Sequence, residues 1–182
     1  MSEQQMAPVR RVLTGHTAAG AATIIEDGLA PAVRTVLERP GYRVTNLWAT
    51  HGSPAPINAD DDGLAELKGV MPPAHGTVVR IIDFPPDSKD PAERERAFNA
   101  SFSHLFRDAD HRPRAGQHPG MHKTESVDYA IVMQGEITAI LEDTETVLRA
   151  GDVLIQRGTN HAWANRSDGF ARICFVLIDG KS

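Results

Sequence analysis

The carboxy-terminal third of the chain is a series of short apolar runs separated by turn residues. Six runs are rich in valine, isoleucine and other strand-forming residues: YAIVMQG, EITAILED, TETVLRAGD, VLIQRG, NHAWANRSDG and ARICFVLIDG. Glycine, aspartate or asparagine interrupts them at intervals of roughly ten residues, a spacing typical of antiparallel sandwiches and barrels. In EITAILED, the apolar side chains of Ile137, Ala139 and Leu141 fall on one face of an extended chain. The sequence therefore predicts an all-β fold of half-buried antiparallel strands.

One further strand and one short helix are expected before this region. The run GTVVRIIDFPPD (76–87) predicts a strand that ends at two prolines, because proline has no N–H to donate to a neighbouring strand. The next segment has Asp90 at the N-cap, Pro91 at the first helical position and Glu93 three residues after the cap, a typical helix start. Its apolar residues recur at helical spacing, at Ala97, Phe98, Phe102 and Leu105.

The first 70 residues carry weaker strand signals. The runs AATIIEDG, AVRTVLER and YRVTNLWAT are strand-like and are separated by glycine and proline. They are too short and too few to form a separate domain. We therefore expect residues 1–70 to be an extension that packs on a barrel, adding strands to it or covering its mouth, and residues 71–182 to form the barrel domain.

Composition narrows the class of protein. A chain of 182 residues is long enough for one domain with a proper core, and its formal net charge of −5 gives no basic face for nucleic acid. No window is apolar enough to span a membrane, and the start MSEQQMAPVRR lacks the apolar core of a signal peptide. The single cysteine, Cys174, is expected to be a buried small hydrophobe in a reducing compartment. We expect a cytoplasmic protein with a small-molecule partner and neither nucleic-acid nor membrane partners.

Two histidines and an aspartate form the candidate site. In an extended chain His122, Thr124 and Asp128 share one face, because alternate residues of a strand point the same way. His161 follows in GDVLIQRGTNHAWAN and can join them from a neighbouring strand of a barrel. Two neutral imidazoles and a carboxylate suit iron, manganese, nickel or zinc as a divalent ion, with positions left open for water or substrate.

These residues also carry a family resemblance. The chain resembles the cupin superfamily, in particular its small stand-alone single-barrel members, whose first motif is G-x5-H-x-H-x3,4-E-x6-G and whose second is G-x5-P-x-G-x2-H-x3-N. The matching positions are Gly116, His122, Thr124, Asp128 and Gly135 in the first motif and Gly151, Gly158, His161 and Asn165 in the second. Two departures stand out: Thr124 replaces the second histidine, and Gln156-Arg157 replaces a proline-containing turn with a gap one residue shorter. The resemblance covers about residues 76–180.

The resemblance implies a jelly-roll β-barrel, usually dimeric, with a metal ion inside its mouth. Carried over position by position, the metal ligands are His122, Asp128 and His161. Thr124 is a poor ligand, and the aspartate is one methylene shorter than the usual glutamate, so the metal is expected to be weakly held. A metal-free pocket is the alternative, and His118 or Glu125 are possible substitute ligands.

Two functions are compatible with such a site. In the first, the chain is a metal-dependent enzyme (a lyase, isomerase, decarboxylase or dioxygenase) acting on an oxygenated, partly apolar molecule, in which the metal polarises an oxygen atom or binds O2. Asp128 and Thr124 are then the candidate catalytic residues, and Trp163, Gln156 and Trp48 the candidate substrate-binding residues. In the second, the barrel binds or senses a ligand without turnover. In both cases we expect a homodimer, because a small barrel leaves sheet edges and apolar surface to cover.

Overall fold

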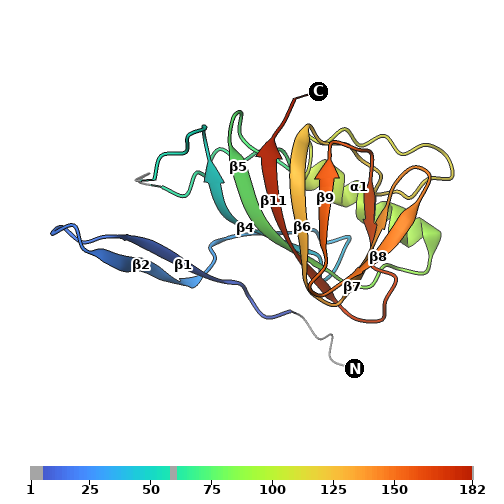
Figure 1. Ribbon diagram of the computed structural model, residues 1–182. Coiled ribbons are helices and arrows are strands. Elements are labelled where there is room, and N and C mark those ends of the chain that lie inside the picture. The colour runs from blue at the N-terminus through green and yellow to red at the C-terminus, as the bar shows by residue number, and fades with distance from the viewer. Residues whose placement is uncertain (1–5, 58–60, 182) are drawn as a thin grey trace.

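The chain folds into two facing antiparallel sheets, one helix and a separate hairpin (Figure 1). The computed structural model describes residues 6–57 and 61–181. The larger sheet has the order β3 (Ala32–Thr35), β4 (Arg43–Thr50), β5 (Thr77–Phe84), β11 (Ala171–Asp179), β6 (Ser126–Gln134), β9 (Val153–Arg157). The smaller sheet has the order β10 (Ala162–Ala164), β7 (Glu136–Ile140), β8 (Glu145–Arg149). The predicted all-β jelly-roll barrel is confirmed.

The predicted helix is also present. Helix α1 (Pro91–His104) begins after Asp90, whose carboxylate accepts hydrogen bonds from the backbone N–H groups of Ala92 and Glu93. These bonds satisfy N–H groups that have no partner within the first turn. In Figure 1, α1 runs behind β6 and β9, and its buried residues Phe98, Ser101 and Phe102 line the interior of the barrel.

The amino-terminal region divides into two parts. Strands β3 and β4 join the larger sheet through the pairing of β4 with β5. Strands β1 (Arg10–His16) and β2 (Ala22–Leu29) form a hairpin that projects away from the sheets (Figure 1). Arg11 anchors the hairpin by donating to the Leu47 carbonyl at 3.0 Å and to the Asp62 carboxylate at 2.7 Å. Residues 1–5 and 58–60 of the expected extension lie outside the described residues, and the division at residue 70 stays a prediction.

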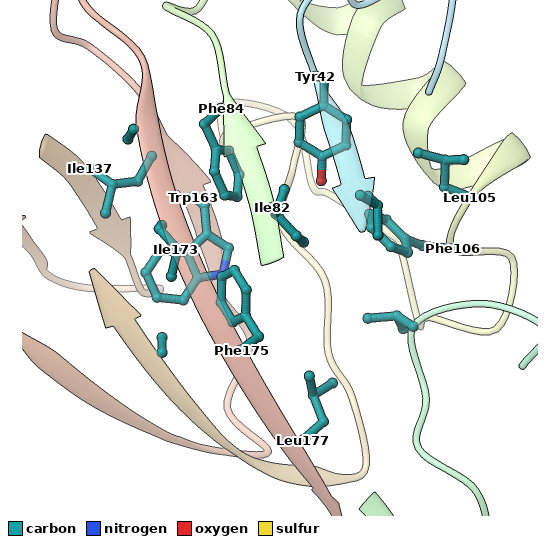
Figure 2. Packing of buried hydrophobic residues seen from close by; sticks show 14 of the residues in the cluster. Tyr42, Ile82, Phe84, Leu105, Phe106, Ile137, Trp163, Ile173, Phe175 and Leu177 are labelled. Carbon is teal, nitrogen blue, oxygen red and sulfur yellow. The ribbon is translucent and has the colours of Figure 1, made fainter. Parts of the chain in front are cut away.

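The core lies between the two sheets (Figure 2). Aromatic rings from different elements meet edge to face: Trp163 lies 5.3 Å from Phe175, and Tyr42 lies 5.4 Å from Phe84, between ring centroids. Ile137 contributes to this core from the smaller sheet. Burial of these large side chains is the main source of stability, since each contributes about 1.5–3 kcal/mol by leaving water.

Residues of the two cupin-like motifs also have structural roles. Gly135 has a φ of 77°, and a Cβ at this position would lie 2.3 Å from the Phe170 carbonyl oxygen, so only glycine fits the turn. The Asn165 amide is fully buried and donates to the carbonyl oxygens of Phe84 and Gly169. Asn165 thus ties the loop before β11 to the end of β5.

One expectation about β11 is wrong. Cys174 is half-buried rather than buried, because Ile173 and Phe175 occupy the inward positions of β11 and Cys174 alternates to the outer face. Within the residues that the structure describes, no helix is long and apolar enough to cross a membrane.

Candidate functional site

A cavity of about 60 Å³ lies between the inner face of the larger sheet and helix α1. All the residues that line it are buried. Its aromatic lining residues are Tyr42, Phe84, Phe98, Phe102, Phe106, Trp163 and Phe175. The polar lining residues are Arg39, Arg80, Ser101, His122, Thr124, Asp128 and His161. An apolar cavity with a few converging polar groups is the usual form of a small-molecule site.

Five residues predicted from the sequence meet in this cavity: His122, Thr124, Asp128, His161 and Trp163. His122 and His161 lie directly opposite each other, and each backbone N–H donates to the other residue's carbonyl at 2.9 Å. Their ring centroids are 4.3 Å apart. The short bridge therefore brings two imidazoles from distant parts of the chain side by side.

The orientation of both rings is fixed by backbone carbonyls. Nδ1 of His122 lies 2.9 Å from the Gly120 carbonyl oxygen, and Nδ1 of His161 lies 2.9 Å from the Thr159 carbonyl oxygen. A carbonyl can only accept, so each Nδ1 carries the proton and each Nε2 keeps a free lone pair. This arrangement is common for histidines that bind metal ions, because the backbone bond fixes the tautomer.

Burial keeps both imidazoles neutral. It lowers the pKa of His161 to about 4. It also lowers the pKa of His122 well below the usual value, and the neighbouring His161 adds to this effect. Metal binding requires neutral imidazole, so the pair is ready to coordinate an ion at neutral pH.

Asp128 is held by a neighbouring hydroxyl. Ser126 Oγ donates to Asp128 Oδ1 at 2.6 Å and contacts Thr124 Oγ1 at 2.9 Å. Burial raises the pKa of Asp128 to about 6, while the Ser126 hydrogen bond and the positive charge of Arg80 oppose the rise. A carboxyl group with a pKa close to neutral can take up or release a proton under physiological conditions.

Arg80 is a cavity residue that sequence reasoning missed. It lies on β5 and is 1% exposed, and its Nη1 donates to the Gly69 carbonyl at 3.2 Å. Its Nε and Nη2 have no hydrogen-bond partner within the described part of the chain. Burial lowers the pKa of Arg80 to about 10, which leaves the guanidinium charged at neutral pH. The signal was a charged residue at the inward parity of an apolar strand, between Val78 and Ile82.

Comparisons with known proteins support the same family. The model of the cupin domain family matches residues 111–178. Phomopsin biosynthesis cluster protein C' of Diaporthe leptostromiformis is 46% identical over 182 residues, covering 94% of this chain and 78% of that protein. This chain belongs to the cupin superfamily. Protein D of the same cluster and organism is 31% identical with the same coverage, and the cupin-domain-containing oxidoreductase virC of Hypocrea virens is 29% identical, covering 94% of this cupin and 76% of virC.

A cupin 2 conserved barrel domain protein from Salinispora arenicola has a similar structure. It covers 80% of this cupin and 82% of its own chain, with a TM-score of 0.43 and 12% identity. The family assignment rests on the sequence relatives.

The predicted ligand set is only partly assembled in this cupin. The imidazoles of His122 and His161 adjoin, but no three His, Cys, Asp or Glu residues in the described ranges form a group that could hold a metal ion. Asp128 shares the cavity and is bonded to Ser126, so its role as third ligand stays a prediction. Two imidazoles with free Nε2 atoms still fit a divalent first-row ion whose other ligands come from water or substrate.

The remaining predicted site residues lie outside the cavity. Gln156 is buried beside Asp128 on β9, and its amide donates to the Thr159 carbonyl, the same oxygen that accepts from His161 Nδ1. Gln156 therefore positions the His161 loop and does not line the cavity. Trp48 lines a separate pocket with His51 and Glu66.

The two substitute ligands do not reach the cavity either. Glu125 is exposed. His118 accepts a hydrogen bond from the Gly120 N–H through its Nδ1 and packs edge to face on Phe98. Neither residue lines the cavity that holds the imidazole pair.

Proposed function

We propose that this cupin is a metal-dependent oxidoreductase of the dioxygenase type that acts on a small, partly apolar molecule. The observation that carries the proposal is the pair His122 and His161, which are adjacent and neutral, each with a free Nε2, inside a cavity of aromatic walls. The names of relatives agree with it, since virC and fogC are called cupin-domain-containing oxidoreductases and others belong to biosynthesis clusters. Lyase, isomerase or decarboxylase chemistry would use the same two imidazoles.

Each polar residue has a distinct role in this proposal. His122 and His161 would hold a divalent iron, manganese, nickel or zinc ion through Nε2. When bound, such an ion supplies a Lewis acid or redox centre for an oxygen-containing substrate. Asp128, with its pKa of about 6, is mostly ionised at pH 7 and accepts a proton from the substrate, while the Ser126 hydroxyl fixes Oδ1. Thr124 contacts the Ser126 hydroxyl, so that Thr124, Ser126 and Asp128 form one hydrogen-bonded row.

The aromatic walls have a role as well. Trp163 and Phe175 on one side and Phe102 on the other line the cavity and are buried. They keep bulk water from the imidazole pair, which strengthens electrostatic interactions inside the cavity. They also favour a substrate whose body is apolar and whose oxygen groups reach the hydrogen-bonded row of Thr124, Ser126 and Asp128.

Metal content tests the proposal directly. Protein without an affinity tag is stripped of metal, dialysed separately against Fe(II), Mn(II), Ni(II) and Zn(II), and analysed by elemental mass spectrometry. We expect about one ion per chain in the wild type and loss of the ion in His122→Ala and His161→Ala. Thr124→His should raise the metal affinity, because it adds an imidazole on the same cavity wall. His118→Ala removes an imidazole outside the cavity and is the matched control. A wild type that binds none of the four ions, with no gain in Thr124→His, would contradict the proposal.

A ligand-binding or sensing role is the second candidate. It is favoured by Thr124 in place of a histidine and by the incomplete ligand set of the described residues. Oxygen uptake by the metal-loaded protein with candidate substrates separates the two roles. A ligand that binds without oxygen uptake or product formation would support the sensing role.

A further inference from the structure

Arg80 is a buried cation that has no direct ion pair with a carboxylate among the described residues. It lies on the inner face of β5, opposite Asn46 on β4 and Phe175 on β11. Its single hydrogen bond in the described part of the chain goes to a backbone carbonyl, and it forms no ion pair there. A buried charge without a partner is destabilising by several kcal/mol.

The other arginine that lines the cavity has its charge balanced. Arg39 Nη2 donates to Asp87 Oδ1 at 3.0 Å. Its guanidinium lies 4.2 Å from the ring centroid of Tyr42 and 4.0 Å from that of Phe98, so both ring faces stabilise the cation. The fold is therefore able to neutralise a buried arginine at this cavity, and it does so for Arg39 and not for Arg80.

The carboxylates that most influence Arg80 are already engaged. Asp108 accepts the backbone N–H groups of Val70 and Met71 with its two oxygens, at 2.7 and 3.1 Å. Asp128 accepts from Ser126. Both act on Arg80 through space, without a direct bond. Arg80 lines the cavity, and neither carboxylate occupies its Nε or Nη2.

The two unpartnered nitrogens of Arg80 are chemically significant. Nε and Nη2 form one edge of the guanidinium, with two parallel N–H groups spaced to match the two oxygens of a carboxylate. The same edge is used elsewhere in this chain: Arg10 donates through Nε and Nη2 to the two oxygens of Asp27, at 2.6 and 2.7 Å. In Arg80 this edge has no hydrogen-bond partner in the described part of the chain, and aromatic rings form part of the cavity wall that Arg80 lines.

We propose that Arg80 binds the carboxylate of the substrate through its Nε and Nη2, so that the site selects small carboxylic acids with an apolar body. This inference rests on the proposed function in one respect, that the ligand occupies the cavity beside His122 and His161. The carboxylate end meets Arg80, and the apolar part packs on rings such as Trp163 and Phe175. The cavity volume of about 60 Å³ corresponds to a few water positions, because one water needs about 10–15 Å³, and it suits a small acid or the acid end of a larger one.

Binding of matched acids and amides to metal-free protein tests the inference. Benzoate and butanoate are compared with benzamide and butanamide by isothermal titration calorimetry. The acids should bind at least about tenfold more tightly, because only they supply the anion. Because these titrations use metal-free protein, they test Arg80 separately from the metal site. A wild type that fails to bind the acids contradicts the role of Arg80, whereas a wild type that fails to bind metal contradicts the proposed enzyme.

Substitution of Arg80 gives the second arm of the test. Arg80→Met should weaken benzoate binding at least about tenfold, and Arg80→Lys, which keeps the charge but loses the two-donor edge, should weaken it by a smaller factor. Arg10→Met removes an exposed arginine on the projecting hairpin and should leave benzoate binding unchanged.

Thermal stability distinguishes a ligand-binding arginine from a structural one. Arg80→Met should melt at the wild-type temperature or above it, because it removes a buried unpaired charge, and benzoate should no longer raise its melting temperature. If Arg80→Met does not fold, Arg80→Lys decides through its benzoate affinity. The inference is overturned if the wild type binds benzoate no better than benzamide, or if a folded Arg80 variant binds benzoate as tightly as the wild type.

Discussion

The two faces of strand β5 carry buried charge in opposite ways. On the outer face, Asp83 is 1% exposed and accepts from Arg43 at 2.6 Å and from Arg172 at 2.6 Å. The three residues stand in register on β4, β5 and β11, and the Ala7 carbonyl accepts from both arginines. On the inner face, Arg80 has no anion in the described part of the chain. The outer cluster therefore holds β4, β5 and β11 together. We propose that the charge of Arg80 on the inner face is instead neutralised by a bound ligand.

The inner and outer faces of strand β6 also differ in the side chains that they carry. Its inner face carries Ser126 and Asp128, while its outer face carries Tyr129, which is 39% exposed. Tyr129 pairs with Ile155 of β9, which is 52% exposed on the same face. The inner face also carries the buried Ala130 and Val132, so the outer face differs in exposing its apolar side chains. We propose that a second copy of the chain covers this outer face, which makes the protein a homodimer.

Loss of the first 70 residues would disturb both faces of the larger sheet. Of the changes predicted here, it should have the largest effect on stability. A chain that begins at Met71 lacks β4, and with it Arg43 of the outer cluster and Val44 of the core. We expect aggregation or a much lower melting temperature, measured by circular dichroism. A chain that begins at Ala32 loses the projecting hairpin but keeps β3 and β4, and should retain the fold. Unchanged melting of the chain from Met71 would show that residues 1–70 are an independent appendage.

Removal of the outer-face anion should strongly destabilise the sheet. Asp83→Ala leaves the half-buried Arg43 and Arg172 without their carboxylate, with only backbone carbonyls as acceptors, and should lower the free energy of unfolding by up to about 3–5 kcal/mol. Urea denaturation measures this loss. Asp27→Ala breaks the exposed pair with Arg10 and should cost much less stability than Asp83→Ala. Equal losses in the two variants would abolish the distinction between buried and exposed pairs.

Removal of the inner-face carboxylate of Asp128 should raise the free energy of unfolding, whereas removal of the Asp83 carboxylate lowers it. Burial raises the pKa of Asp128 from 3.8 to about 6, so its favourable contribution is present below pH 3.8 and is lost as pH rises through 6. In metal-free protein at pH 8, Asp128→Asn should raise the free energy of unfolding by up to about 3 kcal/mol, since one pKa unit corresponds to about 1.4 kcal/mol. At pH 4 the gain should largely vanish. Denaturation at both pH values checks this, and a loss of stability at pH 8 would contradict it.

Charges on the outer apolar face should change association and leave the fold nearly unaffected. The single substitution Ile155→Glu places a charge on an exposed position, where the cost to the monomer is within about 0.5 kcal/mol. Light scattering should show a change from twice the 19.8 kDa chain mass to the mass of a single chain. Val147→Glu, on the exposed face of β8, is the control and should remain dimeric. A wild type that is already monomeric would refute the proposed dimer.

Local patterns in the sequence predicted most of the fold. Alternation with a period of two and the turn residues located the strands, and the N-cap at Asp90 located the helix, because these signals depend on neighbouring residues. The spacing of His122, Thr124 and Asp128 placed them on one cavity wall, and the resemblance to cupins added His161. The shared placement follows because a strand fixes the direction of alternate side chains, while the roles of these residues stay predictions.

Other features were decided by contacts between distant residues. A β-bulge between Asn46 and Trp48 shifts the register, so Trp48 pairs with Val79 on the outer face and is turned away from the cavity. The partners of a buried charge are likewise set by strand order, since Asp83 meets Arg43 and Arg172 only when β4, β5 and β11 align. By itself the sequence predicted the helix, the shared face of His122, Thr124 and Asp128, and the described strands except β1. Only the tertiary structure decided that Arg80 is buried with no ion pair among residues 6–57 and 61–181, because charge pairing depends on which strands become neighbours.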